Sequence, residues 1–380
     1  MTLVSISLAT AVTLGSFLQA GEPLPATSTL HSQTIENQHV ADADTGERVR
    51  IAAGALMLHY DKATGLWDNK GWWNGANALT TLAMATKVSH SGVDPQVFRN
   101  TFVKAQLRFP GFLNEFYDDE GWWALGWIEA YDATADASYL TAAKRIFTDM
   151  TGGWDETCGG GIWWKKDRHY KNAIANELFL AVAARLGLHT KGAERTKYRS
   201  WALREWRWFQ ASGMINQDDL INDGLTSACR NNARNTWSYN QGVILGGLAS
   251  LSQLTGDKSM LKTALTIADA ATTHLVDKDG ILHDKTEPHC SPDAVQFKGI
   301  FVRNLLPLEL SSPKQRTTQF VQTNADAIWK TARTPANGFA CSWNGPPNED
   351  GPGASSSALD AFVVSALLTA HQDGSIAKTR

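Results

Sequence analysis

Residues 355–372 read SSSALDAFVVSALLTAHQ, and this stretch indicates how the chain folds. Leu359, Phe362, Val363 and Ala366 recur in it at the spacing of one helix face. Most positions between them are also small or apolar. A helix that is apolar almost all round is buried, whereas a helix with one apolar stripe lies at the surface. The stretch therefore predicts a core helix.

The same periodicity recurs along the chain, while strand-like alternation is scarce. We expect about twelve helices, at residues 47–60, 73–89, 95–109, 120–133, 137–151, 171–188, 192–212, 237–255, 258–276, 296–311, 314–333 and 355–372. Even-numbered segments are apolar almost all round, as in VILGGLASL, and odd-numbered segments have charged faces, as in RTKYRSWALREWRWF. This alternation predicts an inner ring of buried helices inside an outer ring.

The connections between the helices alternate as well. Turns that leave inner helices are short, such as LTGDK, whereas segments that lead into them are longer and rich in Trp, Asp, Asn, Gly and Cys. Six helical hairpins with the elaborate loops at one end describe an all-α fold, the (α/α)6 toroid, as one domain over residues 46–374. Its active site would lie at the N-termini of the inner helices. An open helical-repeat solenoid is the alternative.

The composition excludes several classes of protein. Of the 380 residues, 43% are hydrophobic and 19% are charged, which excludes wholesale disorder. The formal net charge of −3 provides no basic surface for nucleic acid or an anionic membrane. The ten His residues show no metal-ligand spacing, so we expect no metal and no cofactor. Gly159-Gly160-Gly161 lacks the Lys-Ser/Thr of a phosphate-binding loop, and we expect it to let backbone pass close to a ligand or a neighbouring segment.

The N-terminal residues indicate export. Residues 3–18 are apolar and small, which predicts a signal peptide over residues 1–20, although no Lys or Arg precedes Arg48. An uncleaved leader or a short anchor is the alternative. Residues 21–45 are typical of a linker, and residues 375–380 form a polar tail. We therefore expect a secreted monomer whose mature chain has no membrane span.

Four cysteines occur in four of the long loops, namely Cys158, Cys229, Cys290 and Cys341. In a secreted protein they predict two disulfides, with three possible pairings.

Two neighbouring acids, Asp118 and Asp119, stand before an apolar helix and are candidate catalytic residues. Asp is also a good N-cap or first-turn residue, but two Asp and Glu120 are more charge than one cap needs. Two carboxylates ~5 Å apart at an effective dielectric of ~20 repel by ~3 kcal/mol, which is roughly 2 pKa units. One can stay protonated while the other is ionised, as glycosidic bond cleavage requires. Such close spacing predicts a covalent intermediate and retained anomeric configuration.

Aromatic pairs and short polar side chains surround these acids in the sequence. The candidate platforms for sugar rings are Trp72, Trp73, Trp122, Trp123, Trp163 and Trp164, of which we expect about one in each pair to pack in the core instead. The candidate hydrogen-bonding groups are Asn74, Asn172, Asn176, Asp223, Tyr239, Asn240 and Gln241. Asn172 and Asn240 are also the expected helix caps.

An ordered set of motifs resembles glycoside hydrolase family 76, the endo-α-1,6-mannanases of fungi and bacteria, over about residues 46–372. The motifs are YDDEGWW at 117–123, GGGIWW at 159–164, KNAI at 171–174, NDGL at 222–225, WSYNQG at 237–242 and FKGIFVR at 297–303. The last motif adds Lys298 to the candidate substrate-binding residues.

The resemblance implies a fold, an activity and residue roles. The family has the (α/α)6 fold, needs no metal and acts on α-1,6-linked mannan. Its pattern makes Asp118 the nucleophile and Asp119 the acid/base, and Asp223 resembles a carboxylate that holds the mannose beside them. The polar C-terminus departs from the membrane-tethered relatives that transfer glycans into the cell wall.

Other functions remain open at this point. A covalent intermediate could pass to a sugar hydroxyl, which would make the protein a transglycosylase, or the scaffold could be an inactive carbohydrate-binding member. A Mg²⁺-dependent terpene cyclase is disfavoured because Arg230 stands where a carboxylate ligand should follow Asn222-Asp223.

Overall fold

The computed structural model describes residues 45–67, 71–347 and 350–374. They belong to one compact unit, Asp42–Arg380. The predicted signal peptide, almost all of the linker and the polar tail lie outside the described residues, so those predictions stand as made.

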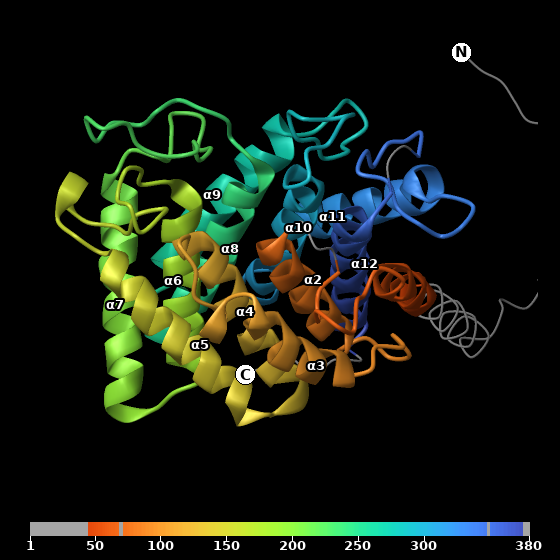
Figure 1. Ribbon diagram of the computed structural model, residues 1–380. Helices are drawn as coiled ribbons and strands as arrows, with labels where there is room; N and C mark the ends of the chain where they lie inside the picture. Colours follow the sequence, from red (N-terminus) through yellow and green to blue (C-terminus); the bar gives the residue numbers. More distant parts are fainter. Residues whose placement is uncertain (1–44, 68–70, 348–349, 375–380) are drawn as a thin grey trace, which may run out of the picture. The chain divides into compact units, whose positions relative to one another are not determined.

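Six apolar helices form the inner ring (Figure 1). They are α2 (Trp72–Ala85), α4 (Tyr117–Thr134), α6 (Ala173–Leu188), α8 (Ser238–Thr255), α10 (Phe297–Ser311) and α12 (Pro352–Gln372). Each packs against the next, and α12 packs against α2, which closes the ring. The closed ring confirms the predicted toroid and excludes the open solenoid.

The outer helices alternate with the inner ones along the chain. They are a helical segment over residues 45–57, α3 (Gln96–Lys104), α5 (Ala137–Met150), α7 (Gly192–Ala211), α9 (Ser259–His274) and α11 (Gln315–Ala327), which continues into a π-helical turn, Ile328–Ala332. The apolar faces of these helices lie against the ring. In the described residues, β-structure is limited to isolated bridges.

Burial explains why α12 is so apolar. By length and composition this helix could cross a membrane, but 83% of its apolar window is buried. Phe362 and Val363 are almost fully enclosed, and Asp360 pairs with Arg303 of α10 in the core at 3.2 Å. The helix therefore serves as an element of the inner ring.

Two disulfides join the long connections that precede inner helices, several of which lie along the upper side of Figure 1. Cys158–Cys229 links the connections that lead into α6 and α8, and Cys290–Cys341 links those that lead into α10 and α12. The prediction of two disulfides is confirmed, and the structure selects one of the three pairings.

The start of α4 differs from the prediction. The helix begins at Tyr117 instead of residue 120, and its N-cap, Phe116, makes no side-chain capping bond. Asp118 and Asp119 therefore lie inside the first helical turn, where the positive end of the helix dipole favours their ionised forms. The alternative that one of them is the N-cap is wrong, whereas the alternative that they are first-turn residues is confirmed.

Candidate active site

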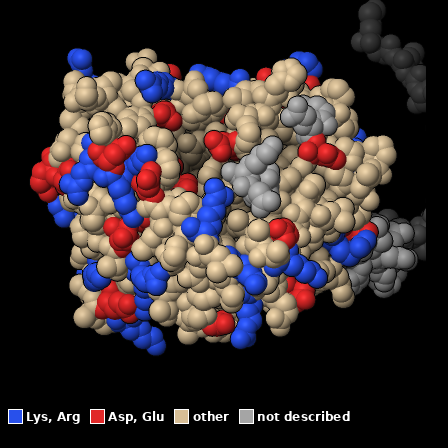
Figure 2. Space-filling view, in the orientation of Figure 1, with Lys and Arg blue, Asp and Glu red and all other residues tan. Residues whose placement is uncertain are grey.

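A cavity of about 540 Å³ lies at the N-terminal ends of the inner helices and contains both members of the acid pair. Its lining comes from α2, α4, α6, α8, α10 and the connections before α4, α6, α8 and α10: Trp73, Phe116, Asp118, Asp119, Trp122, Trp164, Tyr170, Asn172, Ile174, Asp223, Arg234, Tyr239, Asp293 and Phe297. Acidic and basic side chains are intermixed over the face drawn in Figure 2 and form no large patch of one sign.

Each carboxylate of the pair accepts a hydrogen bond from one side chain. Trp164 Nε1 donates to Asp118 Oδ2 at 2.9 Å, and Asn114 Nδ2 donates to Asp119 Oδ2 at 2.6 Å. The second oxygen of Asp118, Oδ1, is buried without a protein partner. A buried oxygen without a partner is costly, so this atom is suited to a ligand that enters the cavity.

The environment raises the pKa of both acids. Burial raises the pKa of Asp118 well above its ordinary value, and the charge of Asp119 raises it further. Burial also raises the pKa of Asp119, to about 6. The hydrogen bonds from Trp164 and Asn114 oppose these shifts because they stabilise the ionised carboxylates. Since the two acids interact, they titrate as a pair that holds one proton over an intermediate pH range.

Glu120, the third acid of the run, points away from the cavity. Its side chain is fully buried, accepts from the backbone N–H of Asn114 at 3.2 Å and pairs with Lys166 at 2.8 Å. Burial raises the pKa of Glu120 to about 8. Glu120 therefore anchors the segment that carries Asn114, while Asp118 and Asp119 face the cavity.

Aromatic rings form much of the cavity wall. The rings of Trp73 and Trp122 stack with their centroids 5.8 Å apart, and the ring centroids of Tyr239 and Phe297 are 4.0 Å apart. Trp73 Nε1 donates to Asp293 at 3.1 Å, so the ring has a fixed direction. Flat apolar surfaces of this kind suit the C–H face of a sugar ring.

Asp223 supplies a further carboxylate to the cavity. Tyr170 donates its hydroxyl proton to Asp223 Oδ2 at 2.5 Å, and Asn232 Nδ2 donates to the same hydroxyl at 2.8 Å. Burial and the bond to Asp223 strongly raise the pKa of Tyr170, which keeps this phenol neutral. The chain of donors fixes one oxygen of Asp223 and orients its carboxylate for polar ligand groups.

The structure brings six of the sequence-predicted substrate residues together at the cavity with the acid pair: Trp73, Trp122, Trp164, Asn172, Asp223 and Tyr239. Asn172 also caps α6 through the N–H of Ala175. The expectation of a cap is met at Asn172. At Asn240 it is wrong, because α8 begins after Trp237.

 Trp163 does not line the cavity, and its Nε1 donates to Asp155 at 2.7 Å.

The other predicted substrate residues lie outside the cavity lining, and each has a packing or bonding role. Trp72 and Trp123 pack against each other in the core, with ring centroids 5.2 Å apart. Asn74 donates to Gln296 at 2.8 Å. Lys298 is buried against Glu287, with Nζ 2.5 Å from Oε1. In this structure these four residues make packing or bonding contacts and do not line the cavity.

Three predicted amide side chains are also enclosed in the ring. Asn176 bonds both backbone groups of Ile162, at 2.7 and 3.0 Å, and Gln241 bonds both backbone groups of Ile221, at 2.7 and 2.9 Å. The amide of Asn240 is buried without a protein partner. Asn176 and Gln241 therefore hold the preceding connections to the inner helices, and neither lines the cavity.

Sequence reasoning missed several residues that line the cavity or bond to its acids. Asn114 and Tyr170 hold the acids Asp119 and Asp223, but they lie outside any pattern that marks a site. Asp293 lies in the connection before α10 and meets Trp73 across 220 positions of sequence. The available signal was their place in the long loops that lead into inner helices. Among the described residues, no group of three or more His, Cys, Asp or Glu side chains could hold a metal ion.

Replacing Asp118 by Asn is expected to raise the melting temperature at pH 8 by about 1–3 °C. The folded state holds the proton of Asp118 more tightly than the unfolded chain, so ionisation destabilises the fold as the pH rises above the ordinary carboxyl pKa. At about pH 3 both states are protonated, and the two proteins should melt alike. Calorimetry at both pH values checks this, and an equal difference at both would contradict the assigned cause.

Comparisons with known proteins place this site in a family. The glycosyl hydrolase family 76 model matches residues 45–379. Mannan endo-1,6-alpha-mannosidase DFG5 of Candida albicans is 26% identical over 72% of this chain and 66% of its own length. The protein of the same name from Saccharomyces cerevisiae is 29% identical over 60% of this chain and 54% of its own length. The chain thus spans only part of these two relatives.

Solved structures have the same fold. One is an inactive variant of the alpha-1,6-mannanase GH76A of Salegentibacter sp. HEL1_6, with two neighbouring aspartates replaced by alanine, in complex with alpha-1,6-mannotetrose. It has a TM-score of 0.76 and 22% identity, covering 85% of this chain and 99% of the other. Dfg5 from Chaetomium thermophilum in complex with glucosamine has a TM-score of 0.75 and 23% identity, covering 87% and 91%. Because the family model matches most of its length, the chain belongs to glycosyl hydrolase family 76.

Proposed function

We propose that this glycosidase is a secreted, monomeric, retaining endo-α-1,6-mannosidase that hydrolyses α-1,6-linked mannan. The observation that carries the proposal is that two adjacent carboxyls of one helical turn open into the same aromatic cavity. Family membership and the names of the fungal relatives support the substrate class. The two disulfides support an oxidising compartment outside the cell.

In the proposed reaction Asp118 and Asp119 divide the chemistry. Asp118 attacks the anomeric carbon while Asp119 gives its proton to the leaving glycosidic oxygen, which leaves a covalent mannosyl ester. Asp119 then takes a proton from water, and the water oxygen displaces Asp118 from the anomeric carbon. Two inversions give retention of configuration. Burial raises the pKa of both acids, so the pair keeps a proton for the first step, and the hydrogen bond from Trp164 favours the ionised form of Asp118 that attacks.

The remaining cavity residues would hold the sugar. The Trp73 and Trp122 rings offer stacking surfaces, and Asp223 offers an oriented carboxylate for sugar hydroxyls. The inactive bacterial relative, which lacks both of two neighbouring aspartates yet is in complex with a mannotetrose, supports the separation of binding from catalysis.

The test is digestion of linear α-1,6-mannan. We expect release of short oligosaccharides, with the α-anomer as the first product seen by NMR. Monomer release from chain ends would contradict the endo mode, and a β-anomer would contradict retention. If an added mannooligosaccharide acceptor diverted most of the product into longer chains, the protein would be a transglycosylase.

The pH dependence of kcat/KM is expected to be bell-shaped, because activity requires one proton on the acid pair. Activity should fall at low pH, where both acids are protonated, and again at high pH, where the pair has lost its last proton. Initial rates on α-1,6-mannan between pH 3 and 9 measure both limbs. A profile without an alkaline limb would remove the role of Asp119 as acid.

A further inference from the structure

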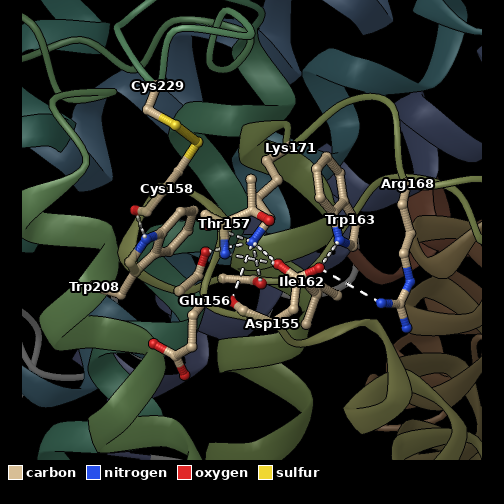
Figure 3. Close-up of polar contacts among 12 residues, drawn as sticks. Asp155, Glu156, Thr157, Cys158, Ile162, Trp163, Arg168, Lys171, Trp208 and Cys229 are labelled. Carbon is tan, nitrogen blue, oxygen red and sulfur yellow. Dashed lines mark hydrogen bonds and ion pairs between the residues drawn. A yellow bond between two sulfur atoms is a disulfide. The ribbon is translucent and has the colours of Figure 1, made fainter.

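The side chain of Lys171 ends inside a shell of oxygen atoms, apart from the residues that line the cavity (Figure 3). Its Nζ lies 2.9 Å from Asp155 Oδ1 and close to four carbonyl oxygens: 3.3 Å from Asp155, 2.7 Å from Thr157, 2.7 Å from Gly160 and 3.0 Å from Gly161. The side chain is 1% exposed. All five contacting atoms are acceptors, so the shell suits the charged ammonium, which has three donors and no acceptor.

Two aromatic rings complete the surroundings of this ammonium. The Trp163 ring centroid lies 4.8 Å from Nζ, and the Trp208 centroid lies 6.0 Å from it. The negative faces of such rings attract a desolvated cation. Burial lowers the pKa of Lys171, and the hydrogen bond and charge of Asp155 oppose this shift and favour the charged ammonium. The Lys171 ammonium is therefore surrounded by oxygen acceptors and aromatic faces, as a bound cation would be.

The shell explains the glycine run of the connection before α6. Gly160 has φ 138° and Gly161 has φ 78°, conformations that favour glycine. A Cβ on Gly161 would lie 2.3 Å from the Trp208 ring, and one on Gly160 would lie 2.9 Å from it. The two glycines let the backbone pass against Trp208 with their carbonyls in reach of Lys171.

Hydrogen bonds connect the oxygen shell around Lys171 to Trp164, the residue that follows Trp163. Asp155 uses its second oxygen to accept from Trp163 Nε1 at 2.7 Å, so one carboxylate bridges Lys171 and Trp163. The backbone N–H of Trp164 donates to the carbonyl of Tyr170 at 2.8 Å, directly before Lys171. The position of Trp164 is thus fixed from both sides by the segment that Lys171 organises.

Trp164 in turn contacts the acid pair. Its Nε1 donates to Asp118 Oδ2 at 2.9 Å, and its carbonyl accepts from the N–H of Tyr117 at 2.9 Å. Burial and the charge of Asp119 both disfavour ionised Asp118. The indole N–H is the side-chain donor that favours the anion, which a nucleophile must be.

We propose that Lys171 is a positioning residue whose ammonium acts as a built-in cation, fixing residues 155–164 so that the Trp164 indole donates to Asp118. The inference rests on the proposed role of Asp118 as nucleophile. Lys171 itself does not touch the substrate and acts through Trp164.

The first test compares Lys171→Met, which keeps the aliphatic stem, with Lys144→Met. Lys144 pairs with Glu194 between two outer helices and contacts neither the oxygen shell nor the cavity, so it serves as the matched control. We expect Lys171→Met to lower kcat about 10- to 100-fold with little change in KM, and to move the acid limb of the kcat/KM profile up by about one pH unit. An unchanged acid limb would overturn the proposal.

A double-mutant cycle tests the route through Trp164. Trp164→Phe removes the donor and keeps a ring, so it should shift the acid limb as Lys171→Met does. The double variant should then be little worse than Trp164→Phe alone, whereas additive losses would overturn the route. If Lys171→Met does not fold, Asp155→Asn takes its place in both experiments, with the same direction expected and the same overturning result.

A readout without substrate separates this inference from the proposed function. In protein labelled with 5-fluorotryptophan, the ¹⁹F resonance of Trp164, assigned by its absence in Trp164→Phe, should titrate with Asp118. The midpoint should rise in Lys171→Met and stay in place in Lys144→Met. This result holds even if α-1,6-mannan is not the substrate, and equal midpoints in all proteins would overturn the inference while leaving the proposed function intact.

Discussion

Replacing Asp118 by Asn is expected to lower kcat/KM on linear α-1,6-mannan by ~10⁴-fold or more. The amide cannot attack the anomeric carbon, so no covalent intermediate forms. Its shape matches the carboxylate, and it can still accept the 2.9 Å hydrogen bond from Trp164. Binding of mannooligosaccharides should therefore remain, and calorimetric titration alongside initial rates would show loss of turnover without loss of affinity.

The matched control is Asp136→Asn, because Asp136 caps α5 through the N–H of Ser138 and lies outside the cavity. Asn is as good a cap as Asp, so both stability and turnover should be unchanged. Turnover of Asp118→Asn within tenfold of the unsubstituted protein would refute the assignment of the nucleophile.

Replacing Asp119 by Ala is expected to lower kcat/KM on mannan by ~10²–10⁴-fold. The loss should be much smaller on an aryl α-mannoside with an acidic phenol, since that leaving group needs no proton. Azide should restore turnover and give the α-mannosyl azide, because a small anion can enter the space of the missing carboxylate and needs no general base. Rates on both substrates and the configuration of the azide product check this.

Asn114→Ala provides the graded companion to this experiment. It leaves Asp119 in place but removes the 2.6 Å hydrogen bond that favours its anion. The pKa of Asp119 should rise, and the alkaline limb of the pH profile should move to higher pH while the acid limb stays. Equal sensitivity of Asp119→Ala to good and poor leaving groups would instead exclude Asp119 as the proton donor.

The helices were predictable because their apolar periodicity is set by burial. The inner helices have apolar residues on nearly every face, since they touch neighbours on both sides of the ring, and this marks them in the sequence. The start of α4 was misplaced by three residues. Its first turn carries Asp118 and Asp119, polar residues that local pattern assigns to a loop but that the cavity requires on the helix.

The site was predictable only in part, because residue type does not reveal direction. Trp122 and Trp123 are adjacent and identical, yet one lines the cavity and the other packs against Trp72. Asn172 faces the cavity, whereas Asn176, one turn later, bonds to Ile162. Contacts between distant segments, such as the one that brings Asp293 to the cavity, arise from ring closure and leave no local pattern.

The amides of Asn176 and Gln241 have a consequence for how such a protein diversifies. Each binds both backbone groups of one residue in the connection before its own helix: Asn176 binds Ile162, and Gln241 binds Ile221. Apart from the N-cap residues of the two helices, the other residues of these connections are not held by these two amides. Insertions and exchanges in the rest of each connection would therefore leave the inner ring of helices undisturbed. We expect glycan preference to change through substitutions in one connection at a time, on an unchanged helical scaffold.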